Sequence, residues 1–209
     1  MKRDALYARL GLSAAVVLIG ATILYVASPK ESDIFAQCRG GVVGGGAIGG
    51  PFSLMDENGK AVSDTDVITG PTLIYFGYTF CPDVCPLDNV RNAEAVDILE
   101  REGKIVTPVF ISFDPARDTP EVLRDFTDAM HPRMLGLTGT PEQIKAASAA
   151  YKTYFKAQEG GDPNYYLIDH STFSYFMMPG YGFVDYFDRN ISANAMAERL
   201  ACFVDAAGS

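Results

Sequence analysis

The chain has 209 residues, of which 48% are hydrophobic and 21% are charged, a composition typical of a globular protein with one well-buried core. Its net charge is −9 at pH 7; the first 30 residues hold four basic side chains and one acidic side chain, a net +3, so residues 31–209 carry −12. Because an acidic surface repels phosphate backbones, nucleic acid is not expected as a partner.

The N-terminus has the pattern of a membrane anchor. Residues 11–27, GLSAAVVLIGATILYVA, carry no charge and follow a basic head, which keeps the N-terminus in the cytoplasm. Tyr25 stands where a signal-peptide cleavage site needs a small residue, so the sequence favours an uncleaved anchor over a cleaved signal peptide. At about 1.5 Å per residue the run reaches roughly 25 Å, a short span. We therefore expect residues 1–30 to form a cytoplasmic head and a single-pass inner-membrane helix, with the rest in the periplasm.

Residues 31–50 are expected to be a tether, because seven of the thirteen residues in CRGGVVGGGAIGG are glycine. A phosphate-binding loop would need a Lys-Ser or Lys-Thr pair and a helix after the glycines, and neither follows. The next residues, PFSL, indicate an extended strand instead. Residues 51–209 are then expected to form the folded domain.

Strand and helix patterns alternate along this domain. FSLMDENGKAVS predicts two short strands about a turn, and TLIYFGYTF is typical of a buried strand. Apolar positions such as Leu87 and Val90 predict a helix over about residues 86–101, and IVTPVFISFD predicts the next strand. Thr119 and Thr140 each precede Pro-Glu, the N-cap pattern of two further helices.

The last part of the domain is predicted to hold two strands and a helix. YYLID and GFVDYF are expected to be strands joined through HSTFSYFMMPGY, and residues 192–207 to form a closing amphipathic helix. The alternation implies βαβ units around a partly parallel sheet. A cysteine pair where a central strand meets its helix is the arrangement of a thioredoxin-like α/β fold.

The stretch FCPDVCP holds Cys81 and Cys85 at this junction. The positive end of the helix lowers thiol pKa values and favours the thiolate, which is both a nucleophile and a metal ligand. Three residues separate the cysteines, whereas the thioredoxin-type redox motif has two, and an offset of four places both sulfurs on one helix face. A structural disulfide, a redox couple and a metal site remain open. Zn(II) requires four ligands, whereas Cu(I) accepts two or three soft ones.

The chain has two histidines that could complete a metal site, His131 and His170. His131, in DAMHPRM, is expected at a helix end, where histidine commonly caps carbonyls or faces water. His170 ends the YYLID strand, and groups at neighbouring strand ends converge on one crevice. Because a histidine at a strand end is often structural, spacing leaves the role of His170 open.

The run YFGYTFCPDVCP resembles the metal-binding signature of the Sco/SenC family, membrane-tethered, thioredoxin-fold copper proteins that help assemble cytochrome c oxidase. ISFDPARDTP, HPRMLGLTGTPEQI and YLIDHSTFSYFMMPG match later blocks of the family in order, over residues 46–204. The resemblance implies that Cys81, Cys85 and His170 bind copper, as Cu(I) and Cu(II). It also implies a metallochaperone, with cytochrome c oxidase subunit II and other periplasmic copper carriers or thiol reductants as partners.

Two functions of different classes remain open. One is this copper carrier, which is not an enzyme; the other is a thiol-disulfide oxidoreductase that uses a reversible Cys81–Cys85 disulfide on exported cysteine pairs. His170 distinguishes them, because a dithiol exchanger does not need it. A peroxidase is a weaker third candidate, since a second cysteine four residues away favours chelation or rapid disulfide closure.

The remaining two cysteines are Cys38, in the tether, and Cys202, in the last helix. In an oxidising periplasm they are expected to form a structural disulfide, although Cys202 is equally consistent with a small buried hydrophobe. A lipid-modified Cys38 is disfavoured by the preceding Phe-Ala-Gln.

Other polar and soft side chains near these motifs have simpler interpretations. Asp114, Arg117 and Asp118 are expected to form an ion pair and a turn that order the loop before the next helix. Met177 and Met178 are neighbours in the sequence, so their side chains point to opposite faces and at least one belongs to the core. Neither is proposed as a ligand. Asp83 either tunes the charge of the cysteines or is an exposed loop acid.

Overall fold

The computed structural model describes residues 33–40, 47–159 and 165–208. The chain divides into two compact units, residues 1–34 and 35–209, of which the second holds the folded domain. The predicted anchor, within residues 1–30, lies outside the described residues. Within the described part, no helix has the length and apolar character needed to cross a membrane.

A mixed sheet of seven strands organises the described part of the domain, in the order β2-β1-β5-β4-β3-β8-β9. β3, β4 and β5 run parallel, and the other neighbouring pairs are antiparallel. β6 and β7 pair as a separate two-stranded antiparallel sheet. The strands are β1 (Ser53–Asp56), β2 (Ala61–Ser63), β3 (Thr72–Gly77), β4 (Thr107–Ser112), β5 (Leu135–Thr138), β6 (Phe155–Ala157), β7 (Ile168–His170), β8 (Ser174–Met178) and β9 (Gly182–Phe187).

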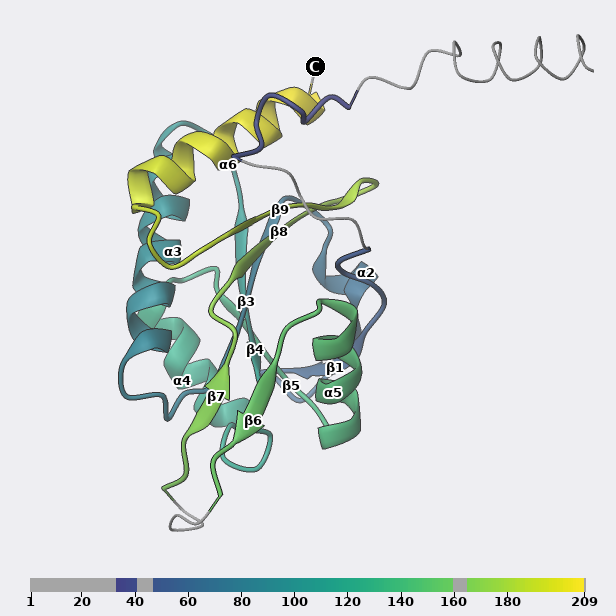
Figure 1. Ribbon diagram of the computed structural model, residues 1–209, viewed down its shortest axis with the longest axis vertical. Coiled ribbons are helices and arrows are strands. Elements are labelled where there is room, and N and C mark those ends of the chain that lie inside the picture. Colours follow the sequence, from purple (N-terminus) through teal and green to yellow (C-terminus); the bar gives the residue numbers. More distant parts are fainter. Residues whose placement is uncertain (1–32, 41–46, 160–164, 209) are drawn as a thin grey trace, which may run out of the picture. The chain divides into compact units, whose positions relative to one another are not determined.

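Helices cover both faces of the sheet. α3, α4 and α6 lie on one side and α5 on the other, as Figure 1 shows. Thr119 and Thr140 cap α4 and α5 through their side chains, and a proline follows each cap, which confirms the predicted helix starts. The helices are α2 (Asp64–Val67), α3 (Val84–Arg101), α4 (Pro120–Met130), α5 (Pro141–Ala150) and α6 (Ala193–Gly208).

β3 is the strand that positions the two central cysteines. All six of its residues are buried, because helices cover both faces of the sheet; this explains its continuous apolar sequence. The strand ends at Gly77, where an added Cβ would meet the Cys85 sulfur at 2.9 Å and the Phe110 ring at 3.0 Å. A side chain at this position would therefore displace the sulfur, so glycine allows the start of α3 to approach the strand.

The structure corrects the predicted end of the domain. HSTFSYFMMPGY is not simply a connection, because it contains β8, which lies between β3 and β9. All residues of β8 are buried, so its sequence lacks the alternation that marks a half-exposed strand. β7 belongs to the small two-stranded sheet and not to the central one. β5 and β6 were not predicted from the sequence.

The predicted helix after the cysteines is correct, but its apolar pattern marks the buried face only in part: Ala93 and Leu99 are buried, and two other apolar residues are not. Leu87 is 60% exposed and Val90 is 45% exposed, whereas Asp88, Asn89 and Asn92 are buried. These polar residues are hydrogen-bonded: Asn92, for example, donates to the Ser174 hydroxyl at 2.9 Å. Satisfied hydrogen bonds remove most of the cost of burying polar groups, which is why the polar face turns inward.

Cys38 and Cys202 are joined by a disulfide in the structure, across a sequence separation of 164 residues. The bond ties the segment before the Gly run to α6, where Cys38 is buried in the same cluster as Phe35 and Phe203. The loop it closes includes most of the domain. A cross-link over so long a loop restricts the unfolded chain strongly.

Candidate metal centre

Cys81 and Cys85 lie on either side of the start of α3. Cys81 is in the loop after β3 and is 8% exposed, and Cys85 is in the first turn of the helix and fully buried. Asp83, at the N-cap of α3, makes no side-chain capping hydrogen bond. The Cys81 sulfur instead accepts the Cys85 backbone N–H at 3.4 Å. A sulfur at this place lies at the positive end of the helix dipole, as predicted from the sequence.

The pKa values of the two thiols are shifted in opposite directions. A hydrogen bond from the Cys85 side chain lowers the pKa of Cys81 to about 3, with help from the backbone N–H groups of Asp83 and Cys85, while burial opposes the shift. The pKa of Cys85 is raised, because its thiol gives that hydrogen bond and is buried. At neutral pH the reduced pair is therefore one thiolate and one thiol.

His170 is held with the correct nitrogen toward the sulfurs. Its Nδ1 lies 2.8 Å from the Ser171 carbonyl oxygen, and its Nε2 lies 3.3 Å from the Cys85 sulfur. A carbonyl oxygen only accepts, so Nδ1 carries a proton, and in the neutral ring the lone pair of Nε2 then faces the cysteines. Ligating histidines commonly have this arrangement, in which the second ring nitrogen donates to a carbonyl.

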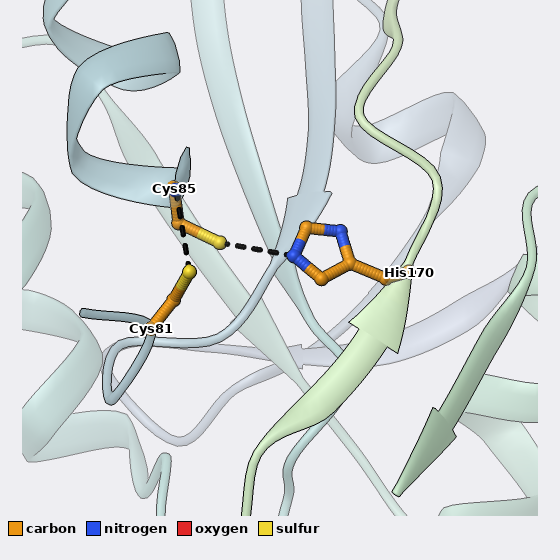
Figure 2. A group of neighbouring side chains, drawn as sticks. All are labelled: Cys81, Cys85 and His170. Atoms are coloured by element: carbon orange, nitrogen blue, oxygen red, sulfur yellow. Dashed lines mark hydrogen bonds between the residues drawn. The ribbon is translucent and has the colours of Figure 1, made fainter. Parts of the chain in front are cut away.

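The structure brings the predicted ligands together from distant parts of the chain, as Figure 2 shows. The two sulfurs and a ring nitrogen of His170 all lie within 4.8 Å of one another. The His170 ring packs against three aromatic rings, of Tyr75, Tyr78 and Phe113, at centroid distances of 6.4, 5.8 and 5.6 Å. Two sulfurs and an imidazole fit a soft ion such as Cu(I) better than they fit Mg²⁺ or Ca²⁺.

A cleft of about 420 Å³ opens beside this group. Cys81 and His170 line it, together with the exposed Asp83 and Asp169, whereas Cys85 lies behind them. A partner entering the cleft therefore meets the Cys81 sulfur first. The exposed position of Asp83 is consistent with a loop acid.

The predicted Asp114, Arg117 and Asp118 turn forms and also supports the cysteine loop. Arg117 pairs with Asp114, as expected, and lies 4.7 Å above the ring of Phe80, the residue before Cys81. The buried Asp118 accepts hydrogen bonds from the backbone and side chain of Thr79 at 3.0 and 2.5 Å. The turn thus fixes the residues that precede Cys81.

Sequence reasoning missed a polar network beside the site. Tyr75 donates to Asp88 at 3.0 Å, and Asp88 pairs with Arg91 at 2.8 Å. Asp88 and Asn92 follow Cys85 by three and seven residues, a spacing that places them on the same helix face. Cys85 is buried, so this spacing is the signal that could have placed the polar residues on the inward face.

A second cluster of ligand-type side chains consists of Asp97, Glu100 and His131, within 4.8 Å of one another. His131 is buried at the C-cap of α4, the helix end that the sequence predicted. Its Nδ1 accepts the Arg133 backbone N–H at 3.0 Å, so Nε2 carries the proton, 3.4 Å from an Asp97 oxygen. This is the opposite tautomer to that of His170, and it leaves no lone pair for a metal.

Met177 and Met178 are both buried core residues, as expected for at least one of them. Met177 pairs with Thr72 at the start of β3, whereas Cys81 follows the end of that strand. The two methionines are therefore separated from the sulfur site by the length of β3.

Comparisons with known proteins identify the family. The model of the SCO1/SenC family matches residues 42–205. Protein SenC of Rhodobacter capsulatus is 53% identical over 195 residues, which cover 93% of this chain and 88% of SenC. The SCO1 homolog 1 of Arabidopsis thaliana mitochondria is 41% identical over 161 residues, 77% of this chain and 48% of that protein.

Solved structures show the same fold. Copper-bound ScoI of Arabidopsis thaliana is 40% identical with a TM-score of 0.71, over 75% of this chain and 98% of that one. Copper-bound Sco1 of yeast is 36% identical with a TM-score of 0.72, over 77% of this chain and 90% of that one. The match confirms the predicted thioredoxin-like α/β fold. The family model, these identities and the CPDVCP and DH motifs together establish that the chain belongs to the SCO1/SenC family.

Proposed function

We propose that this protein binds copper through Cys81, Cys85 and His170 and carries it to the copper centre of cytochrome c oxidase subunit II. The observation that carries the proposal is the convergence of two sulfurs with the lone-pair nitrogen of a histidine fixed by the Ser171 carbonyl. Family members solved with copper bound, at 36% and 40% identity, support it.

The site has the properties of a carrier. Two thiolates suit Cu(I), and the imidazole makes Cu(II) accessible as well. Three ligands leave the coordination shell incomplete, and Cys81 faces the cleft while Cys85 is buried. A partner ligand can therefore displace Cys81 and His170 before Cys85 releases the ion.

A thiol-disulfide exchange function is the second candidate, because the low pKa of Cys81 gives it a thiolate at neutral pH. The Cys81 thiolate would attack a disulfide of an exported protein and form a mixed disulfide, releasing one partner thiolate. Cys85, after losing its proton, would then attack Cys81 and release the second. The products are a reduced partner and a Cys81–Cys85 disulfide, which a thiol reductant must reduce again.

We also propose that residues 1–30 anchor the protein in the inner membrane and that the domain faces the periplasm. The charge-free run and the basic head of the sequence support this topology, and a disulfide between Cys38 and Cys202 suits an oxidising compartment. Other periplasmic copper carriers and thiol reductants are the proposed further partners.

The copper ligands are tested by substitution. The reduced protein is expected to bind one copper ion, and Cys81→Ser or Cys85→Ser to abolish tight Cu(I) binding. His170→Ala is expected to weaken Cu(II) binding more than Cu(I) binding, because two thiolates still hold the softer ion. Competition titrations with chromophoric chelators measure both affinities.

The chain supplies matched controls for this test. The double variant Cys38→Ser/Cys202→Ser removes two cysteines outside the site, and His131→Asn removes the other histidine while keeping an acceptor for Arg133. Both are expected to retain copper. Full Cu(I) binding by Cys81→Ser/Cys85→Ser would contradict the proposal.

The asymmetry of the thiols predicts a pH profile. Because the pKa of Cys81 is about 3, its thiolate fraction stays constant from pH 8 to pH 5 and falls only below that range. Its alkylation rate with iodoacetamide, followed by peptide mass spectrometry, should be nearly flat there, whereas a thiol with a pKa of about 8.5 slows roughly tenfold per unit. Cys85→Ala removes the main hydrogen bond and should make the rate fall with decreasing pH. A wild-type rate that follows an ordinary thiol would refute the thiolate assignment.

Intact mass of the protein extracted from membranes tests the anchor and the disulfide together. The expected mass includes the N-terminal residues. Alkylation after reduction should add two more alkyl groups, at Cys38 and Cys202, than alkylation without reduction. Loss of about 27 residues, a signal-peptide length, would refute the anchor. Alkylation of both cysteines without reduction would refute the disulfide.

A further inference from the structure

A buried carboxylate lies close behind the metal centre. Asp88 is 2% exposed and stands one helical turn after Cys85. Its Oδ2 accepts a hydrogen bond from the Tyr75 hydroxyl at 3.0 Å, and its Oδ1 accepts one from Arg91 at 2.8 Å. The proposed copper ligands do not include it, and it is too well buried to serve solubility.

Tyr75 connects this carboxylate to the ligands. The point where a Cβ at Gly77 would lie is 2.9 Å from the Cys85 sulfur and 3.0 Å from Cε1 of Tyr75, so the edge of the ring adjoins the sulfur. The same ring meets His170 edge-on, at a centroid distance of 6.4 Å. A phenol has one hydroxyl proton, and Tyr75 donates it to Asp88. The lone pairs of the phenolic oxygen therefore face the other groups around the ring.

Arg91 follows Cys85 by six residues and Asp88 by three, so the guanidinium lies farther along α3 from the metal centre and offsets only part of this negative field. It binds the other carboxylate oxygen of Asp88, and the same Nη1 donates to the Arg189 carbonyl oxygen at 2.9 Å, at the exposed edge of the pair. Arg91 thus contacts the carboxylate through Oδ1, whereas Tyr75 contacts it through Oδ2 and lies between this oxygen and the metal centre.

We propose that Asp88, acting through Tyr75, shifts the preference of the bound copper from Cu(I) toward Cu(II). The inference rests on the proposed copper function. With two thiolates and a neutral imidazole, a Cu(I) centre has a net charge of −1 and a Cu(II) centre has none. A fixed negative charge nearby raises the free energy of the Cu(I) form more. Asp88 is thus a positioning residue that loosens the hold on Cu(I), the ion that two thiolates would otherwise retain most strongly.

The test compares Cu(I) and Cu(II) affinities, each measured by competition with a chelator, on the reduced full-length protein in detergent. Asp88→Asn should raise the ratio of Cu(I) to Cu(II) affinity about tenfold, within the coupling range of residues in one network. Tyr75→Phe should change the ratio in the same direction. Because both act along one path, the double variant should show less than the product of the two effects. The reduction potential of the bound copper should rise in parallel.

Two matched variants control for loss of stability. Asp185→Asn removes another buried carboxylate paired with an arginine, Arg199. Tyr151→Phe removes a fully buried phenol whose hydroxyl has no hydrogen-bond partner in the described part of the chain. Neither should change the ratio, because neither adjoins the site.

An unchanged ratio in Asp88→Asn, or an equal change in the controls, would overturn the inference. If Asp88→Asn fails to fold, Tyr75→Phe decides: a ratio like that of the wild type overturns the inference. Failure of the wild type to bind copper would instead overturn the proposed function, and the inference with it. Copper binding by the wild type with no shift in the variants would overturn the inference alone.

Discussion

The burial of β3 on both faces is the constraint on which the candidate metal centre depends. Because all six residues of the strand are buried, its end is fixed in the middle of the domain, and the loop with Cys81 starts from a rigid position. Gly77 then lets α3 approach until the Cys85 sulfur occupies the space of a side chain. The Cys85 side chain and the backbone N–H groups at the start of the helix stabilise the Cys81 thiolate, so the fold creates the reactivity of the pair.

The two histidines show how one hydrogen bond separates a candidate ligand from a structural residue. Both lie beside groups that bind metals in other proteins. The Ser171 carbonyl fixes the proton of His170 on Nδ1, whereas the Arg133 N–H fixes that of His131 on Nε2. Only the first arrangement directs a nitrogen lone pair at the other ligand-type side chains of the cluster. The tautomer therefore favours the cluster of His170 over that of His131 as the candidate metal site, and sequence spacing does not reveal it.

The features predicted correctly from the sequence are those with a local cause. The caps at Thr119 and Thr140 and the buried β3 pattern each lie within a few residues, and the family motifs identified the ligand candidates. β8 shows no alternation either, but unlike β3 it was missed, because SYFMM lacks the β-branched residues that mark TLIYFG as a strand. The inward face of α3 was misread because Asp88 and its partner Tyr75 are 13 residues apart and become neighbours only in the fold.

X-ray absorption spectroscopy of the copper-loaded protein tests the central claim most directly, because it reports the atoms bound to the ion. The ligand set of Cys81, Cys85 and His170 predicts two sulfur atoms in the Cu(I) and Cu(II) forms, and an imidazole nitrogen in the Cu(II) form that His170→Ala removes. A shell of oxygen and nitrogen without sulfur, or a nitrogen signal that persists in His170→Ala, would contradict it.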